Sequence, residues 1–163
     1  MKDESILELF AHPLSGPPVS IHRYSVLKQS GNLGPKLKEG DYQVPEGVYD
    51  IESLNPNSNF HVSLRLNYPN EYDLQRAKED GRSELGGDIF IHGGASSIGC
   101  LAMGDSVIEE IFTLANDVGI ENMKVISVPI DFRSRHISEI TVSDAAWFQD
   151  LYEQLKTELS EYK

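Results

Sequence analysis

Hydrophobic and polar positions alternate most regularly in residues 60–68, which read FHVSLRLNY. Every second residue from Phe60 to Tyr68 is hydrophobic, and the residues between them are polar or basic. A period of two predicts a β-strand with one buried face, while the other face points to solvent or to a cleft. The segments NPNSN before it and NYPNEYD after it have the composition of turns, so they should bound the strand.

Shorter hydrophobic runs predict further extended segments between turn-rich connections. These segments are residues 6–11, 19–28, 48–51, 88–92 and 123–130. Glycine and proline punctuate residues 30–47, which predicts a long loop. Residues 74–86 read as a polar connection with at most one short helical turn.

Two helices are predicted after the single cysteine, Cys100. Ser106 and Glu109 have the spacing of a capping box, and Gly119 suits the end of the helix that follows them. One face of this helix should carry Val107, Ile111, Leu114 and Val118. A last helix should run from about residue 143 to 162, with Phe148, Leu151, Leu155 and Leu159 on one side. Strands in the first two thirds and two packed helices predict an α+β fold in one domain, residues 1–163.

Composition excludes several classes of partner. Hydrophobic residues make up 39% of the 163 residues and charged residues 25%, as in an ordinary globular domain. A formal net charge of −12 with scattered basic residues argues against nucleic acid and anionic membranes. No apolar run approaches the roughly 20 residues of a membrane span. The start MKDESILELF lacks the sections of a secretory signal, which predicts either an intracellular protein or a trimmed chain.

The lone cysteine also limits the sites that are possible. It excludes an internal disulfide framework and any zinc site with several cysteines. Four further histidines show no paired spacing, so we expect no metal site: His12, His22, His61 and His136.

The segment IHGGASSIGC, residues 91–100, carries the candidate chemistry. A free thiol is only a few per cent thiolate at neutral pH, so a cysteine nucleophile gains from a neighbouring histidine that accepts its proton. His92 ends a predicted strand, and a glycine-rich loop lets Cys100 fold back toward it. Gly99 leaves room for backbone N–H groups to bind an oxyanion. If His92 activates it, the thiol should react with alkylating agents well below pH 8.

Spacing alone leaves other interpretations of the same residues open, including purely structural roles. A buried cysteine beside glycines is often a small core residue, and a histidine at a strand end is often one too. Ser96 and Ser97 are more typical of hydrogen-bonding loop residues than of nucleophiles. A Ser-His-Asp site using Asp88 or Asp105 is a further alternative.

Several motifs in one order resemble the catalytic domain of the L,D-transpeptidases, the YkuD-type family. The family's strand-end His-Gly and its Ser-X-Gly-Cys are matched by His92-Gly93 and by Ser97 to Cys100, followed by Leu101 and Met103. Upstream, the segments GD…PEG and YPN resemble the same domain, and the resemblance spans about residues 4–135. It implies a mainly β mixed sheet or sandwich with two packed helices.

Three departures resemble the YafK-like, murein-processing branch of this family. Ile98 stands where the commoner pattern has a second histidine, and Ala102 where an arginine is frequent. The loop between His92 and Cys100 is also short. The family domain usually begins with one more strand, which favours a trimmed chain.

The resemblance implies cysteine acyl transfer on peptidoglycan stem peptides, without metal or organic cofactor, in the periplasm or cell envelope. Cys100 would attack the carbonyl between a diamino acid and a D-amino acid, His92 would move the proton, and the Gly93 carbonyl would orient the imidazole. Substrate contacts are expected from five residues that could equally serve turn or surface roles: Lys36, Arg65, Tyr68, Asn70 and Tyr72.

Three functions remain open at this point. The acyl-enzyme could pass to an amine, as in a transpeptidase, or to water, as in a carboxypeptidase or an amidase that frees a wall-attached lipoprotein. A wall-binding module with an idle cysteine is the third.

Overall fold

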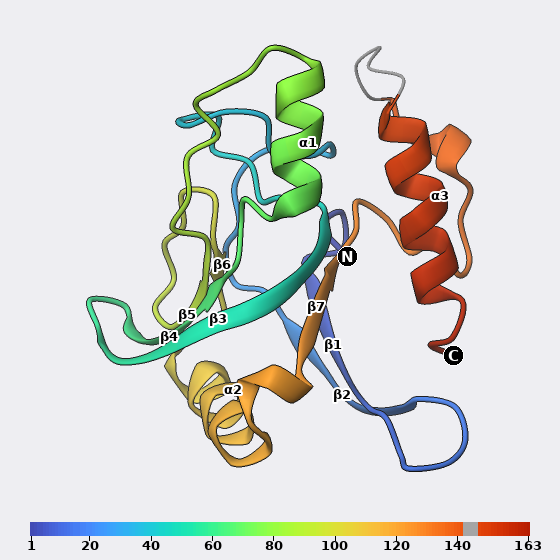
Figure 1. The fold of residues 1–163 in the computed structure, drawn as a ribbon. Coiled ribbons are helices and arrows are strands. Elements are labelled where there is room, and N and C mark those ends of the chain that lie inside the picture. Colours follow the sequence, from blue (N-terminus) through green and yellow to red (C-terminus); the bar gives the residue numbers. More distant parts are fainter. Residues whose placement is uncertain (142–146) are drawn as a thin grey trace.

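A computed structural model describes residues 1–141 and 147–163. Its main sheet has five strands in the order β6–β5–β4–β3–β7, and a second sheet pairs β1 with β2 (Figure 1). The main strands are β3 (Gly47–Ser58), β4 (His61–Leu66), β5 (Phe90–His92), β6 (Leu101–Ala102) and β7 (Lys124–Ser127). The smaller sheet contains β1 (Ile6–Ala11) and β2 (Val19–Ser25), and the helices are α1 (Glu71–Glu79), α2 (Asp105–Val118) and α3 (Trp147–Leu159).

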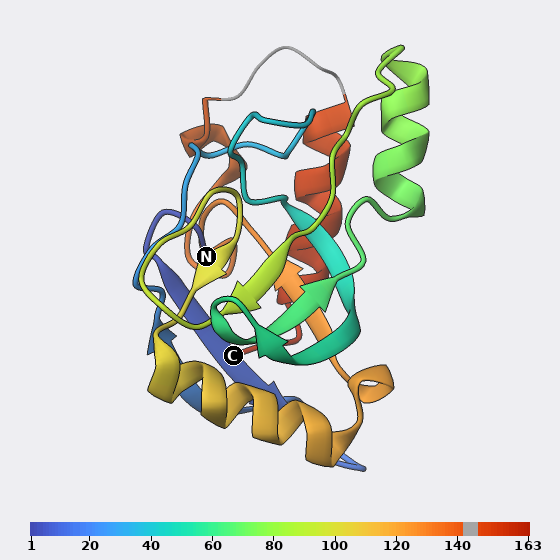
Figure 2. The same ribbon diagram turned by 90° about the vertical axis from the view of Figure 1, so that its left-hand side faces the viewer.

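The main sheet is mixed, because β5 and β6 run parallel and its other neighbours are antiparallel. Figures 1 and 2 show the sheet curling between the three helices, with α2 below its β4–β5 side and α3 on the opposite side, beyond β7. The predicted α+β fold with a mixed sheet is confirmed. The described residues contain one helix more than predicted, α1.

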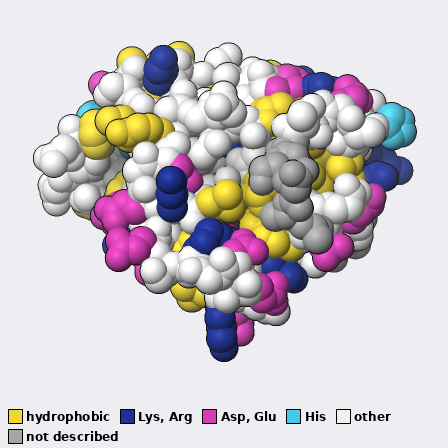
Figure 3. All heavy atoms as spheres, turned by 90° about the horizontal axis from the view of Figure 1, so that it is seen from above, with side chains coloured by type: hydrophobic (Ala, Val, Ile, Leu, Met, Phe, Trp, Pro, Cys, Tyr) yellow, Lys and Arg dark blue, Asp and Glu magenta, His cyan; other side chains and the backbone are white. Residues whose placement is uncertain are grey.

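Two groups of buried hydrophobic side chains hold these layers together. The first lies between the main sheet and α2 and includes Leu64, Ile91, Leu101 and Ile108. The second packs α3 against the chain after β7 and includes Ile130, Phe132, Leu151 and Leu155. On the face seen from above in Figure 3, acidic and basic side chains intermingle around hydrophobic ones.

The alternating segment forms β4, as predicted, and Leu64, Leu66 and Tyr68 are buried. Phe60 is the exception, with 48% of its surface exposed, because it lies in the turn between β3 and β4. The NPNSN segment is wrongly predicted as a turn. Its residues extend β3 to Ser58, which pairs with His61 across a bulged register.

Helix α1 was missed because residues 74–86 read as a polar connection. It begins at Glu71, where Asn70 and Asp73 form a capping box that satisfies two backbone donors. Asn70 and Asp73 have capping-box spacing in the sequence N-E-Y-D, so a short helix could have been predicted from it.

The predicted start of α2 is also wrong. Gly104 precedes the helix, no side chain caps it, and Ser106 lies inside its first turn. The buried face is that of Ile108, Ile111 and Ala115, which is rotated from the predicted one. This rotation leaves Val118 46% exposed.

Helix α3 buries the predicted hydrophobic positions together with Trp147 and Tyr152. Its predicted start near residue 143 lies outside the described residues. Gly119 ends α2 with a positive φ of 87°, as its position suggested. None of the described helices combines the length and hydropathy that crossing a membrane requires.

Candidate active site

The register of β4, β5 and β6 relates the two candidate catalytic residues. His92 pairs with Ser63 on one side and with Ala102 on the other. Paired residues of neighbouring strands point to the same face, and so do residues two apart along a strand. Cys100 directly precedes β6, two residues before Ala102, so the turn that ends in Cys100 leads into the strand that pairs with β5. Ile91 and Leu101, between them, point into the core on the opposite face.

The hydrogen bonds of His92 define its tautomer. The imidazole is buried, with 2% of the residue exposed, and Nδ1 lies 2.6 Å from the carbonyl oxygen of Gly93. A carbonyl oxygen only accepts, so Nδ1 must carry the proton and donate it. In the neutral ring Nε2 is then left as a proton acceptor. The Gly93 carbonyl thus contacts the imidazole, and its role in orienting the ring for catalysis stays a prediction.

Glycine is required at two positions of the loop that joins His92 to Cys100. A Cβ on Gly93 would lie 2.7 Å from both Asp105 Oδ1 and the Phe60 carbonyl oxygen. Gly99 has a backbone φ of 87°, a conformation that residues other than glycine rarely adopt. The loop can therefore turn back on itself and return the chain to β6 beside β5.

The backbone N–H groups expected to bind an oxyanion already have partners. The N–H of Cys100 donates to Ser97 Oγ at 3.0 Å, and that hydroxyl donates to the Cys100 carbonyl at 2.6 Å. The N–H of Gly99 donates to Ser30 Oγ at 2.6 Å. An oxyanion at either donor would have to displace a hydroxyl. Ser30 was not predicted, because nothing local in the sequence links positions 69 residues apart.

The alternative Ser-His-Asp site is not assembled around His92. The Ser97 hydroxyl closes its own turn onto Cys100. Asp105 accepts the N–H of Gly94 at 2.8 Å, and the Asp88 carboxylate pairs with Arg65. His92 uses Nδ1 for a backbone carbonyl instead.

The electrostatic surroundings keep the thiol protonated at rest. Burial raises the pKa of Cys100, and the Asp88 carboxylate raises it further, whereas the Phe90 backbone and Lys36 lower it. The Cys100 thiol lies 3.6 Å from the Asp88 carbonyl oxygen. The raised pKa is opposite in direction to what ready alkylation below pH 8 requires.

Four of the five expected substrate contacts have structural roles. Tyr68 is 3% exposed, with its hydroxyl near the carbonyl oxygens of Lys36 and Leu85. Asn70 caps α1 and donates to the Val48 carbonyl.

The other two are equally engaged. Tyr72 packs edge-on against Trp147 on the α3 side of α1. Lys36 is 8% exposed and forms an ion pair of 2.6 Å with Asp41, which also orders the loop backbone. These four side chains therefore serve packing, capping and loop ordering in this structure, and their contact with a substrate stays a prediction.

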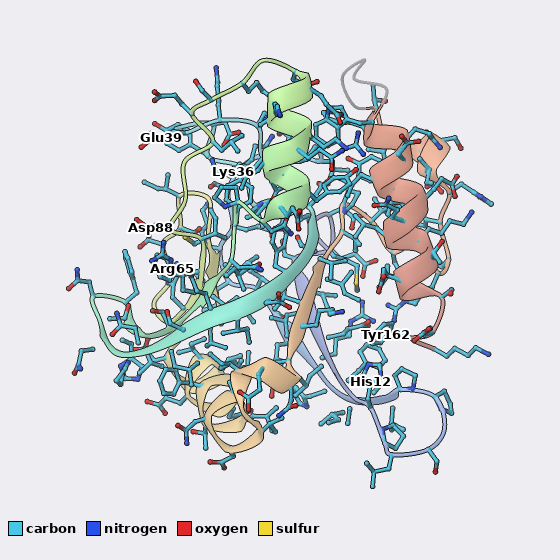
Figure 4. All side chains as sticks on the ribbon, in the orientation of Figure 1. His12, Lys36, Glu39, Arg65, Asp88 and Tyr162 are labelled. Carbon is cyan, nitrogen blue, oxygen red and sulfur yellow. The ribbon has the colours of Figure 1, made fainter. Side chains whose placement is uncertain are left out.

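Arg65 differs from these four. Its register partner is Phe90, two residues before His92, which places Arg65 on the same sheet face as His92. Its side chain is 42% exposed, and the guanidinium pairs with Glu52 and Asp88. Figure 4 shows Arg65 and Asp88 together on the side of the molecule that also carries Lys36 and Glu39.

A groove of about 530 Å³ adjoins the turn that ends in Cys100. It is lined by Ser30, Gly31, Asn32, Asp41, Tyr42 and Ile98. Tyr42 and Ile98 are 58% and 74% exposed, so hydrophobic surface is open to a ligand here. A second cavity, of about 560 Å³, lies between β1 and the inner face of the main sheet. Neither His92 nor Cys100 lines the groove or this cavity, and the groove is the one that contains Ile98, two residues before Cys100.

Comparison with protein families decides the assignment. The chain matches the L,D-transpeptidase catalytic domain, YkuD, over residues 3–126. This chain belongs to that family. The matched span contains both His92 and Cys100 and all strands of the main sheet except the last residue of β7.

Named relatives agree with the YafK-like branch. YafK of Escherichia coli strain K12, a candidate L,D-transpeptidase, is 31% identical over 160 residues, which is 95% of this chain and 61% of YafK. The chain therefore spans about three fifths of the length of this relative.

Two solved structures share the fold. Pgp2 of Campylobacter jejuni, a helical cell shape determining protein, superposes with a TM-score of 0.58 at 24% identity, over 71% of this chain and 42% of its own. Bd1075 of Bdellovibrio bacteriovorus superposes with a TM-score of 0.53 at 18% identity. The match covers 99% of this chain and 52% of Bd1075.

Proposed function

We propose that this protein is a cysteine acyl transferase that acts on peptidoglycan stem peptides. The Cys100 sulfur attacks the carbonyl carbon between a diamino acid and the following D-amino acid. As the C–S bond forms, His92 Nε2 accepts the thiol proton, and it then donates that proton to the leaving amine as the C–N bond breaks. The product is a thioester on Cys100 and a free D-amino acid.

The observation that carries this proposal is the hydrogen bond from His92 Nδ1 to the Gly93 carbonyl. It leaves Nε2 as the only acceptor of the ring. The pairing of β5 with the strand that follows Cys100 supports a role for this acceptor beside the thiol. A base fixed in this tautomer suits a thiol whose pKa is raised, because proton transfer can accompany attack rather than precede it.

Substrate recognition is proposed for the groove beside Ile98 and for Arg65. A stem peptide carries carboxylates, and a partly exposed guanidinium binds them well. Family membership supports peptidoglycan as the substrate and the periplasm or cell envelope as the location. The shape-determining function named for Pgp2 supports a role in wall remodelling.

The fate of the thioester separates transfer from hydrolysis. An acceptor amine gives a new peptide bond, and a wall-attached lipoprotein is one partner that such chemistry would join or release. Water gives a free carboxylate, as in a carboxypeptidase or amidase. The name of the relative YafK favours the transferase.

The test uses synthetic stem peptides, with and without a second amine-bearing peptide, and mass spectrometry of the products. We expect release of the D-amino acid and a joined product, both abolished in Cys100→Ala and reduced at least about 10²-fold in His92→Gln. Leu74→Ala, an exposed position on α1, serves as the matched control. Unchanged peptides with wild-type protein, together with binding that survives Cys100→Ala, would indicate a binding module instead.

A further inference from the structure

The turn between β3 and β4 covers the proposed base. The Phe60 ring packs on the imidazole of His92, with centroids 4.6 Å apart and planes at 37°. His92 is only 2% exposed, whereas Phe60 is 48% exposed. The phenyl ring therefore stands between the imidazole and bulk water, with its outer side facing solvent.

This turn is anchored to α2 rather than left free. His61 Nε2 lies 2.6 Å from Glu109 Oε1, which ties the residue after Phe60 to the helix. The N–H of Phe60 donates to Ser58 Oγ at 3.1 Å, which fixes the inner side of the turn. Figures 1 and 2 both show the β3–β4 turn beside α2.

The backbone around the base packs against the same turn. A Cβ on Gly93 would lie 2.7 Å from the Phe60 carbonyl oxygen and 2.9 Å from His61 Cβ. The Gly93 N–H donates to the Val62 carbonyl at 3.3 Å, just inside the turn. Phe60 and the His92–Gly93 pair therefore form one packed unit, in which a shift of the turn would uncover the imidazole.

We infer that Phe60 is a positioning residue that covers His92 and limits the access of water to it. The inference rests on the proposed function, because only a base that serves a Cys100 thioester needs this protection. In hydrolysis, water attacks the thioester carbon, the C–O bond forms, the C–S bond breaks, and His92 passes the water proton to sulfur. A neutral acceptor amine attacks the same carbon without help from a base: the C–N bond forms, the C–S bond breaks, and the amine proton passes to sulfur. Water needs His92 to take its proton during attack. Limiting the access of water to His92 therefore slows hydrolysis more than transfer.

The test acylates Cys100 with p-nitrophenyl acetate, which requires no peptide recognition, and follows the acetyl-enzyme by intact mass. Decay is measured in buffer alone and with added glycinamide, and Cys100→Ala corrects for acetylation elsewhere. We expect Phe60→Ala to raise the ratio of hydrolysis to aminolysis about threefold to tenfold, the range expected for losing one aromatic contact. Phe60→Tyr should keep the wild-type ratio, and Glu109→Ala should shift it in the same direction by less.

Leu74→Ala controls for the loss of any exposed hydrophobic side chain, since Leu74 is 54% exposed on α1. Phe60→Leu is the second variant, should Phe60→Ala fail to fold as judged by circular dichroism. A ratio that stays at the wild-type value in a folded Phe60→Ala or Phe60→Leu protein would overturn the inference while leaving the proposed function intact. Absence of any acyl group on Cys100 of the wild type, with p-nitrophenyl acetate and with the stem peptide alike, would overturn both.

Discussion

At the scale of single residues, the surroundings of Cys100 disfavour its thiolate form. Burial and the nearby Asp88 carboxylate both raise the pKa of Cys100, and the hydrogen bond to the Gly93 carbonyl leaves His92 ready to accept. Under the proposed function, such a thiol is unreactive without substrate. It gains its reactivity when a bound carbonyl and His92 act on it together.

The first prediction concerns the pH at which the thiol reacts. Asp88→Asn removes a negative charge that disfavours the thiolate, so the pKa of Cys100 should fall and iodoacetamide alkylation should begin at lower pH. The expected shift is on the order of half a pH unit. Alkylation rates measured across pH test this, and a profile that moves upward or not at all would refute the assigned effect of Asp88.

The second prediction concerns the glycine beside the base. Gly93→Ala places a methyl group 2.7 Å from Asp105 Oδ1 and from the Phe60 carbonyl oxygen, so the loop must shift. We expect a loss of about 1–3 kcal/mol in unfolding free energy and a large loss of acyl-enzyme formation.

Gly87→Ala is the matched control, because its Cβ would meet only the Tyr68 carbonyl oxygen at 3.9 Å. Denaturant unfolding and thioester formation are measured on both variants. Equal tolerance of the two substitutions would contradict the tight packing described around Gly93.

At the scale of elements, the sequence predicted those helices and strands whose hydrophobic pattern is local and regular. The alternation in β4 and the hydrophobic spacing in α3 predicted both elements and most of their buried positions. The predicted start of α2 was wrong because Ser106 and Glu109 have the spacing of a capping box, but they do not form one in the structure. Glu109 instead contacts His61 from another element.

The candidate site divides in the same way. His92, Gly93 and Cys100 were readable because they lie in one short segment with a recognisable pattern. Ser30 and Phe60 were not, since the first reaches Gly99 from 69 residues away and the second follows from a turn that β3 and β4 form together. Pairing across strands, which sequence pattern leaves open, decides such contacts.

The third prediction follows from the cap of α1. Burial raises the pKa of Asp73 from its ordinary 3.8 to about 6, so the folded state binds its proton more tightly than the unfolded chain. Its contribution therefore lowers stability as pH rises from about 4 to about 6, by up to about 3 kcal/mol in total.

Asp73→Asn should remove this loss, since the amide oxygen can still accept the Asn70 N–H. Chemical denaturation at pH 4 and pH 7 gives the comparison. The unfolding free energy of the variant should exceed that of the wild type only at pH 7. An equal difference in unfolding free energy at both pH values would exclude Asp73 as the cause.

At the scale of the whole molecule, one buried carboxylate joins three distant parts of the chain. Glu46 is 1% exposed and pairs with Lys2 at 2.9 Å. It also accepts the N–H of Gly34 and the hydroxyl of Tyr152, each at 2.7 Å. The start of the chain, the loop before β3 and helix α3 thus meet at a single group.

The fourth prediction tests this junction. Glu46→Ala leaves Lys2 buried without its partner, which should cost about 3–5 kcal/mol of unfolding free energy. Glu153→Ala removes an exposed pair with Lys156 and should have no measurable effect.

The same unfolding curves test the expectation of a single domain. If residues 1–163 form one domain, fluorescence of Trp147 in α3 and far-ultraviolet circular dichroism should report one coincident transition. Separate transitions, or a Glu46→Ala protein as stable as the wild type, would contradict a junction that unites the molecule.

The most direct test of the central claim is the mass of the intact protein after brief mixing with a stem peptide that ends in a diamino acid and a D-amino acid. Cys100 and His92 acting together predict an adduct equal to the peptide acyl group without the D-amino acid, located on Cys100 by peptide mapping. The adduct should be absent in Cys100→Ala and strongly reduced in His92→Gln. An adduct on another residue, or one formed equally well in His92→Gln, would contradict the account.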